Sequence, residues 1–366
     1  YNYQPTGRIG GVDITAKITG NYSALNLKKL KGRIGKTAIG GTLSAQFSHS
    51  KPFIEADLKT GALNLEKFLP AQNKASFRGL TPRLLPASWQ VPLKPTPNRA
   101  PLLHLTAIKK WPITPLDLSS LNTVNADMTF KIPIIIYDRY LFEKANITAK
   151  IRNGVLEIPR FNTNIFGGSV SGLAQATAKG NQISSSLRIT NLNLEQALKI
   201  NSQNPTVNGR MNIDVDLRTA GHSFSNMVSS LDGRANFAVT EITLDKVRHS
   251  PLLSGLLKHL VRSNPLSNKA AIDEASVSGS FKITNGIATT HDLKLTSAVG
   301  NGKAAGDIHL PNQIINIDGQ LNLTENPLMK ILKAKVRGAS NVIPFAISGP
   351  LKNPRVRVDT NTALNP

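Results

Sequence analysis

The stretch Val277-Ser278-Gly279-Ser280-Phe281-Lys282-Ile283-Thr284-Asn285-Gly286 alternates apolar or small residues with polar ones and ends in a turn sequence. A period of two is typical of a β-strand that buries one of its faces. Asn-Gly is a strong hairpin signal because both residues accept a positive φ. The stretch therefore predicts a β-hairpin with Phe281 and Ile283 on its apolar face.

The same alternation continues toward the C-terminus, where Ile308, Leu310, Ile315, Ile317 and Leu321 are separated by polar residues. Turn sequences divide these runs from one another. They occur at Asn153-Gly154, Lys179-Gly180-Asn181, Asn301-Gly302 and Pro311-Asn312. Together they predict a topology that is mainly an antiparallel meander.

An internal repeat accompanies the alternation. Leu63-Asn64-Leu65 recurs as Leu192-Asn193-Leu194 and as Leu321-Asn322-Leu323 at equal spacing, each time after a Gly-rich strand. Such a repeat indicates a chain built from similar structural units. We divide the sequence into a β module at 1–70, a Pro-rich irregular connection at 71–115, a second β module at 116–200, and a C-terminal β region at 201–366 with a helix near 250–262.

Helices are expected to be few and short. A helical turn follows each Leu-Asn-Leu, and the helix near 250–262 has apolar residues at helical spacing with a basic opposite side. This helix either covers the end of the sheet or docks on a membrane surface. Trp89 and Trp111 lie in the Pro-rich connection, where we expect them to pin that connection to the sheet.

A sheet with one apolar face must cover that face with another layer or with something else apolar. The predicted helices are too few to cover three modules. Two solutions remain, a closed sandwich or barrel with a dry core, or an open curved sheet whose apolar face forms a groove. The residues alone favour the dry core, with the open groove as the alternative, and they establish a fold class that is mainly β.

The charge of the chain indicates its partners. Lys and Arg total 44 against 22 Asp and Glu, so the formal net charge is +22. A broad positive surface attracts nucleic acid, anionic phospholipid or phosphorylated lipopolysaccharide. Basic residues are not interleaved with stacking aromatics, and no zinc spacing or P-loop is present, so nucleic acid is not expected as a partner.

No residue pattern indicates an enzyme. The chain has no cysteine, which excludes a thiol nucleophile and a Cys-ligated metal. His291-Asp292 is the one His beside a carboxylate, and adjacent residues of a strand point to opposite faces. Asp214 and Asp216 near Arg218 indicate a polar outer face. We predict no catalytic residues, no metal and no cofactor.

Two basic clusters stand out as candidates for contact with anionic headgroups, although a solvated strand face explains them equally well. The first cluster is the densest basic run of the chain, and the second lies near the C-terminus. The candidate headgroup contacts are Lys28, Lys29, Lys31 and Arg33 in the first, and Lys330 and Lys333 in the second.

The order of several short motifs resembles that of the AsmA family of Gram-negative envelope proteins. The motifs are Asp216–Gly221, Leu231–Ala235, Gly279–Gly286 with Asp292–Leu295, and Ile343–Pro354, preceded by Pro115–Leu118 and Phe166–Gly172. The resemblance implies a periplasmic body of repeated β modules, an elongated curved antiparallel sheet that forms a hydrophobic groove or an open barrel. It also implies an N-terminal helix that tethers this body to the inner membrane. No run of about 18 to 20 apolar residues is present, so we expect that anchor to be missing from this chain.

The resemblance further implies a non-enzymatic role in phospholipid binding or transfer during outer-membrane biogenesis. The expected partners are phospholipid or another anionic lipid, the inner or outer membrane surface, and envelope assembly proteins. A structural scaffold for outer-membrane protein assembly is the alternative, because exposed sheet edges recruit strands. The candidate groove residues are Phe281, Ile283, Ile308, Leu310, Ile315, Ile317 and Leu321.

Overall fold

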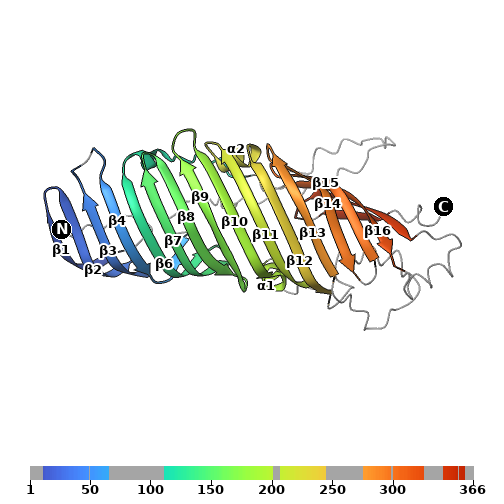
Figure 1. The fold of residues 1–366 in the computed structure, drawn as a ribbon, viewed down its shortest axis with the longest axis horizontal. Helices are drawn as coiled ribbons and strands as arrows, with labels where there is room; N and C mark the ends of the chain where they lie inside the picture. Colours follow the sequence, from blue (N-terminus) through green and yellow to red (C-terminus); the bar gives the residue numbers. More distant parts are fainter. Residues whose placement is uncertain are drawn as a thin grey trace, which may run out of the picture.

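The computed structural model describes residues 11–48, 50–65, 111–200, 207–244, 275–297, 300–324, 341–352 and 354–358. Within these ranges the chain forms one long, open, curved sheet of 18 strands with two short α-helices (Figure 1). The mainly β fold class is confirmed. The sheet is not closed into a barrel, so the open solution applies.

The first strands are β1 (Val12–Asn21), β2 (Ala24–Ile34), β3 (Thr37–Gln46), β4 (Phe53–Thr60), β5 (Leu63–Asn64) and, after the 3-10 helix η2 (Ser119–Asn122), β6 (Asn125–Tyr137). The central part contains β7 (Tyr140–Arg152), β8 (Val155–Ile165), β9 (Gly168–Thr177), β10 (Gln182–Asn193), α1 (Leu194–Lys199), β11 (Val207–Ala220), α2 (Phe224–Ser229) and β12 (Asp232–Leu244). The last strands are β13 (Ala275–Thr284), β14 (Ile287–Ser297), β15 (Gly300–His309), β16 (Ile314–Leu323), β17 (Val342–Pro350) and β18 (Arg355–Val358).

The strands pair in chain order. Every consecutive pair from β1 to β4 and from β6 to β18 is antiparallel, as the predicted meander requires. The exception is β6, which runs parallel to β4 and to the short β5. Register irregularities recur along the sheet, for example between β2 and β3 and between β13 and β14. Such bulges bend strands, so they contribute to the curvature of the sheet.

Tight turns occur at both edges of the sheet, as an antiparallel meander requires. We call the edge that carries Asn153-Gly154 and Asn285-Gly286 the turn edge (upper edge in Figure 1). Asn153-Gly154 and Asn285-Gly286 form such turns with φ of 50° and 84°, and of 48° and 73°. These predictions are confirmed, as are the turns at Lys179–Asn181 and Pro311-Asn312.

The turn predicted at Asn301-Gly302 is wrong, because both residues lie inside β15. Gly302 pairs with Leu295 of β14 and with Leu321 of β16. A Cβ atom on Gly302 would lie 3.3 Å from Leu295 Cβ. The glycine therefore makes room for neighbouring leucines, which is a packing role that the Asn-Gly pattern does not distinguish from a turn.

A segment that we call the strap, Trp111–Leu118, runs along the turn edge toward β6. The Trp111 indole N–H donates to the Leu310 carbonyl at 2.8 Å. Leu116 N donates to the His222 carbonyl at 2.8 Å, and the buried Asn181 side chain donates to the Leu116 carbonyl at 2.8 Å. The strap therefore links the β15–β16 turn to the corner before α2 and to the β9–β10 turn. Trp111 pins its segment as predicted, whereas Trp89 lies outside the described residues.

The repeated Leu-Asn-Leu motifs end strands at the edge opposite the turn edge. Leu192 and Leu321 are buried, and Leu63 packs against the buried Ile132, Ile135 and Ala145. The predicted helical turn after the second copy is α1, with Asn193 as its N-cap. The other helical turns and the helix at 250–262 lie outside the described residues. The sheet continues from β4 to β6 and from β10 to β11 across the proposed module boundaries, and the division into modules stays a prediction.

Candidate functional site

The strand register brings the candidate groove residues on the strands onto one face. Ile283 pairs with Ala288, Ala288 with Ile308, and Ile308 with Ile315. Directly paired residues of antiparallel strands point to the same side of a sheet, and so do residues two apart along one strand. Leu310 lies in the turn after β15, outside this register. Phe281, Ile317 and Leu321 belong to the same face as the paired residues. We call it the apolar face.

The apolar face extends over the whole sheet, well beyond the candidates chosen from the sequence. Phe281 pairs with Ala235, Ala235 with Val215, and Val215 with Leu187. The period-two alternation of these additional strands was the sequence signal that could have identified the further apolar-face residues. The further members include Leu25, Leu27, Leu43, Ile54, Leu58, Phe130, Ile147, Phe161, Val170, Ile189, Ile213, Phe237, Leu295, Phe345 and Ile347.

Burial on the apolar face is incomplete. Ile283, Ile317 and Leu321 are 8%, 6% and 8% exposed, whereas Phe281, Ile308 and Ile315 are only half-buried. The Phe281 ring stacks on Phe237 with centroids 6.1 Å apart. The two helices and η2 contact strands at the sheet edges, and within the described ranges no second layer packs on this face. The described part of the fold thus leaves apolar area available for contact.

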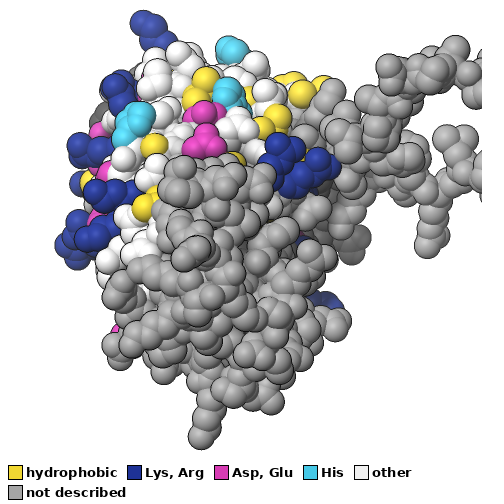
Figure 2. Space-filling model, turned by 90° about the vertical axis from the view of Figure 1, so that its right-hand side faces the viewer, with side chains coloured by type: hydrophobic (Ala, Val, Ile, Leu, Met, Phe, Trp, Pro, Cys, Tyr) yellow, Lys and Arg dark blue, Asp and Glu magenta, His cyan; other side chains and the backbone are white. Residues whose placement is uncertain are grey.

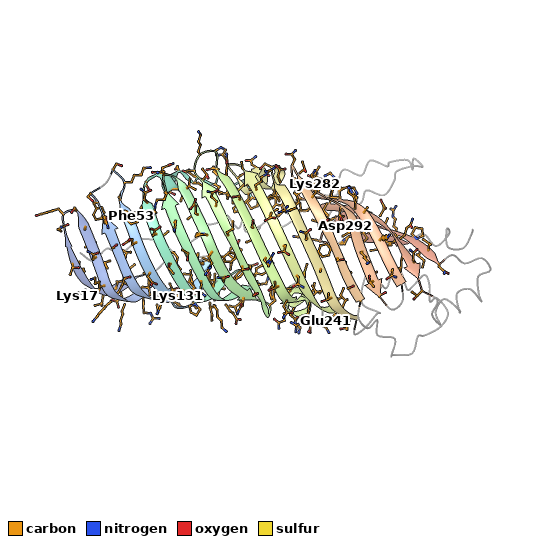
Figure 3. The ribbon with its side chains drawn as sticks, viewed as in Figure 1. Lys17, Phe53, Lys131, Glu241, Lys282 and Asp292 are labelled. Atoms are coloured by element: carbon orange, nitrogen blue, oxygen red, sulfur yellow. The ribbon has the colours of Figure 1, made fainter. Side chains whose placement is uncertain are left out.

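The opposite face is polar and carries ion pairs across neighbouring strands. Arg188 Nε lies 2.6 Å from Asp214 Oδ1, and Arg234 Nε lies 2.8 Å from Asp216 Oδ2. The Ser186 hydroxyl and the Arg234 guanidinium hold the pKa of Asp216 below its usual range. Asp214 also raises the pKa of Arg188. The predicted polar outer face at Asp214 and Asp216 is confirmed, and Figure 3 shows other charged side chains of the sheet, such as Lys17, Lys131 and Lys282.

The basic residues of β2 do not lie beside the candidate groove residues. Lys28, Lys31 and Arg33 are exposed and alternate with the apolar-face residues Leu27 and Leu30, so they point to the polar side. Lys29 is the extra residue at a register irregularity, with φ of 53°. Lys330 and Lys333 lie outside the described residues. Headgroup contact by these six residues stays a prediction.

Among the described residues, no group of three or more His, Asp or Glu side chains could hold a metal ion. His291 and Asp292 are both exposed, and Asp292 accepts hydrogen bonds from the main-chain N–H and the hydroxyl of Ser280 at 2.8 Å each. These bonds, the main-chain bond first, lower the pKa of Asp292 and satisfy its carboxylate structurally.

Comparison with known proteins gives one match. The family model of the AsmA family matches residues 10–293, which covers most of the chain and stops before β15. The motif at Ile343–Pro354 therefore lies beyond the match. No curated protein and no solved structure matches significantly. Among the described residues, no helix has the length and apolar character needed to cross a membrane. The match agrees with the resemblance that the motif order indicated, and an open sheet is the fold that this resemblance implied. The chain belongs to the AsmA family.

Proposed function

We propose that this AsmA-family protein binds phospholipid acyl chains on its apolar face and transfers lipid along it, without covalent chemistry. The observation that carries the proposal is the register, which places apolar side chains of successive strands on one continuous face. Family membership supports a role in the cell envelope. The role that we infer is a contribution to outer-membrane biogenesis from the periplasm, with an N-terminal helix as the tether to the inner membrane.

The energetics favour movement along the face. Burial of each acyl methylene contributes about 0.8 kcal/mol, so a lipid that leaves the face entirely loses many such contributions. A lipid that slides from one strand to the next keeps most of its apolar contacts. A continuous face therefore lowers the cost of displacement compared with release into water. Separate pockets would not provide this advantage.

The first experiment compares two adjacent substitutions on β16. Ile315→Asp places a carboxylate on the apolar face, whereas Asn316→Asp places the same charge on the exposed polar face. Native mass spectrometry of the purified proteins should detect phospholipid with the wild type and with Asn316→Asp, and several-fold less with Ile315→Asp. Circular dichroism must show that both variants are folded. A wild-type protein without bound lipid, or equal lipid in both variants, would refute the proposal.

The alternative function is that of a scaffold for envelope assembly proteins, and the edge strand β1 favours it. Within the described ranges β1 pairs only with β2, and its Val12, Ile14 and Ile18 side chains are exposed. An open edge of this kind can accept a strand from a partner. Capture of an envelope protein by the wild type, with loss of capture when Ile14 is changed to Pro and no lipid bound to either protein, would support the scaffold function instead.

A further inference from the structure

We propose that the turn edge docks on a membrane surface that contains anionic phospholipid, through an exposed apolar row that we call the docking patch. The patch consists of Trp111 and Ile113 on the strap, Phe224 on α2, and Leu351 in the turn after β17. It lies on the edge of the sheet, away from the apolar face, and membrane docking is a separate property from lipid binding by that face.

Hydrogen bonds place the segments that carry the patch beside one another. Ser225 N donates to the Pro112 carbonyl at 3.0 Å, which places Ile113 of the strap beside the start of α2 and hence beside Phe224. The Trp111 indole donates to the carbonyl of Leu310. Leu351 N donates to the carbonyl of Gln313, in the turn that begins at Leu310, at 2.8 Å. The row therefore follows the edge from α2 to the β17–β18 turn.

The side chains of the docking patch are strongly exposed. Ile113 is 81% exposed and Phe224 is 51% exposed. Single exposed apolar residues are common, but a contiguous exposed row marks an interaction surface. Trp111 has its polar N–H satisfied while part of its ring faces solvent, which suits the interface between headgroups and acyl chains.

The charges around the patch select the kind of surface. Lys179 and Lys352 are exposed in turns of the same edge, and His222 lies beside the strap. The same edge also carries acidic residues. Asp117 accepts hydrogen bonds from Ser119, and Asp232, which follows α2, lies 4.0 Å from Arg218. Figure 2 shows hydrophobic side chains in the upper part of the described surface, with His, Lys and Arg side chains and also some Asp and Glu side chains among them. With a net charge of +22, the protein is attracted to an anionic membrane.

Tryptophan fluorescence tests the docking patch directly. The chain has two tryptophans, so Trp89→Phe leaves Trp111 as the only one. With vesicles of phosphatidylcholine and about 30% phosphatidylglycerol, we expect the Trp111 emission to shift to shorter wavelength and to be quenched by brominated acyl chains. An unshifted emission from vesicle-bound protein would overturn the proposal, and so would equal binding to vesicles of phosphatidylcholine alone.

Variants separate the docking patch from other apolar residues and from the apolar face. Ile113→Ser and Phe224→Ser should each weaken vesicle binding by about tenfold, as expected for removal of one apolar side chain from the interface. Leu173→Ser removes a side chain of similar exposure, 49%, from β9 and should leave binding unchanged. Ile315→Asp should bind vesicles normally even where it lacks copurified lipid. Equal losses in Leu173→Ser and Ile113→Ser, or no loss in either, would contradict the docking patch.

Discussion

Asp292 compensates for the bulge between β13 and β14. Ser278 pairs with Lys294 and Lys282 with Thr289, so β14 has one extra residue where Ser280 would otherwise find a partner. Asp292 accepts the main-chain N–H and the hydroxyl of Ser280 and so replaces the missing ladder bond. A negatively charged acceptor strengthens both bonds. The curvature at this point therefore depends on a carboxylate.

Replacement of Asp292 by Asn should lower the free energy of unfolding at pH 7 by about 0.5 kcal/mol, because the site is exposed and screened. The folded-state pKa of Asp292 lies below its ordinary value. Its contribution is therefore present above the unfolded-state pKa of about 3.9 and is lost as the pH falls through the folded-state pKa. Urea unfolding from pH 7 to 3 should show the difference between wild type and variant shrinking. A difference that grows toward low pH would contradict this assignment.

Gly306 lies where β15 and β16 approach each other closely, and its substitution tests how tight this approach is. It has φ of 154°, and a Cβ atom built on it would lie 2.1 Å from the Asn316 carbonyl oxygen on β16. Gly306→Ala should therefore destabilise the protein by about 2 kcal/mol or more in urea unfolding. Gly11→Ala is the control, because nothing lies within 4 Å of its added Cβ. Equal stability of the two variants would show that the backbone at Gly306 relaxes freely.

The elements illustrate what a sequence pattern determines. Alternation and Asn-Gly predicted β13, β14 and their turn correctly, because a half-buried strand and a tight turn each impose a local requirement on residue type. Asn301-Gly302 satisfied the same local pattern, yet packing between Leu295 and Leu321 placed it inside β15. The parallel pairing of β4 with β6 is a long-range contact and leaves no local pattern.

That the candidate groove residues on the strands share one face was predictable for the same reason, since the strand period decides which residues share a face. The strap was not, because its position depends on single hydrogen bonds between distant segments. Leu116 is joined to Asn181 and to His222. Pro and polar residues in the strap obey no period, so the sequence indicated only an irregular connection there.

Asn181→Ala should release the strap from the β9–β10 turn. The side chain is 4% exposed and donates to the carbonyl of the partly buried Leu116, so its removal leaves that acceptor without its partner and should cost about 1 kcal/mol. Hydrogen exchange should accelerate at the amides of 116–118 and remain slow in β13–β16. Asn146→Ala, at an exposed site, is the control. Unchanged exchange at Leu116 would mean that the strap is held by other contacts.

The whole molecule is long because its sheet has a single layer. Apart from the short β5, the strands β1 to β18 lie side by side in chain order. At about 4.8 Å per strand gap this row extends about 77 Å, whereas a compact protein of this length has a radius of gyration near 21 Å and a diameter of about 55 Å. Small-angle scattering should give a maximum dimension of at least about 80 Å. A value near 55 Å for the monomer would contradict the open sheet.

The division of the molecule into an apolar and a polar face is the central claim, and photocrosslinking at adjacent residues tests it most directly. A benzophenone amino acid is placed singly at Phe237, Phe281 or Phe345 on the apolar face, and at the neighbouring Asn236, Lys282 or Ala346 on the polar face. In membranes with radiolabelled phospholipid, irradiation should label the three apolar-face variants and leave the other three unlabelled. Labelling without regard to this alternation, or none at any position in folded protein, would contradict a lipid-binding apolar face.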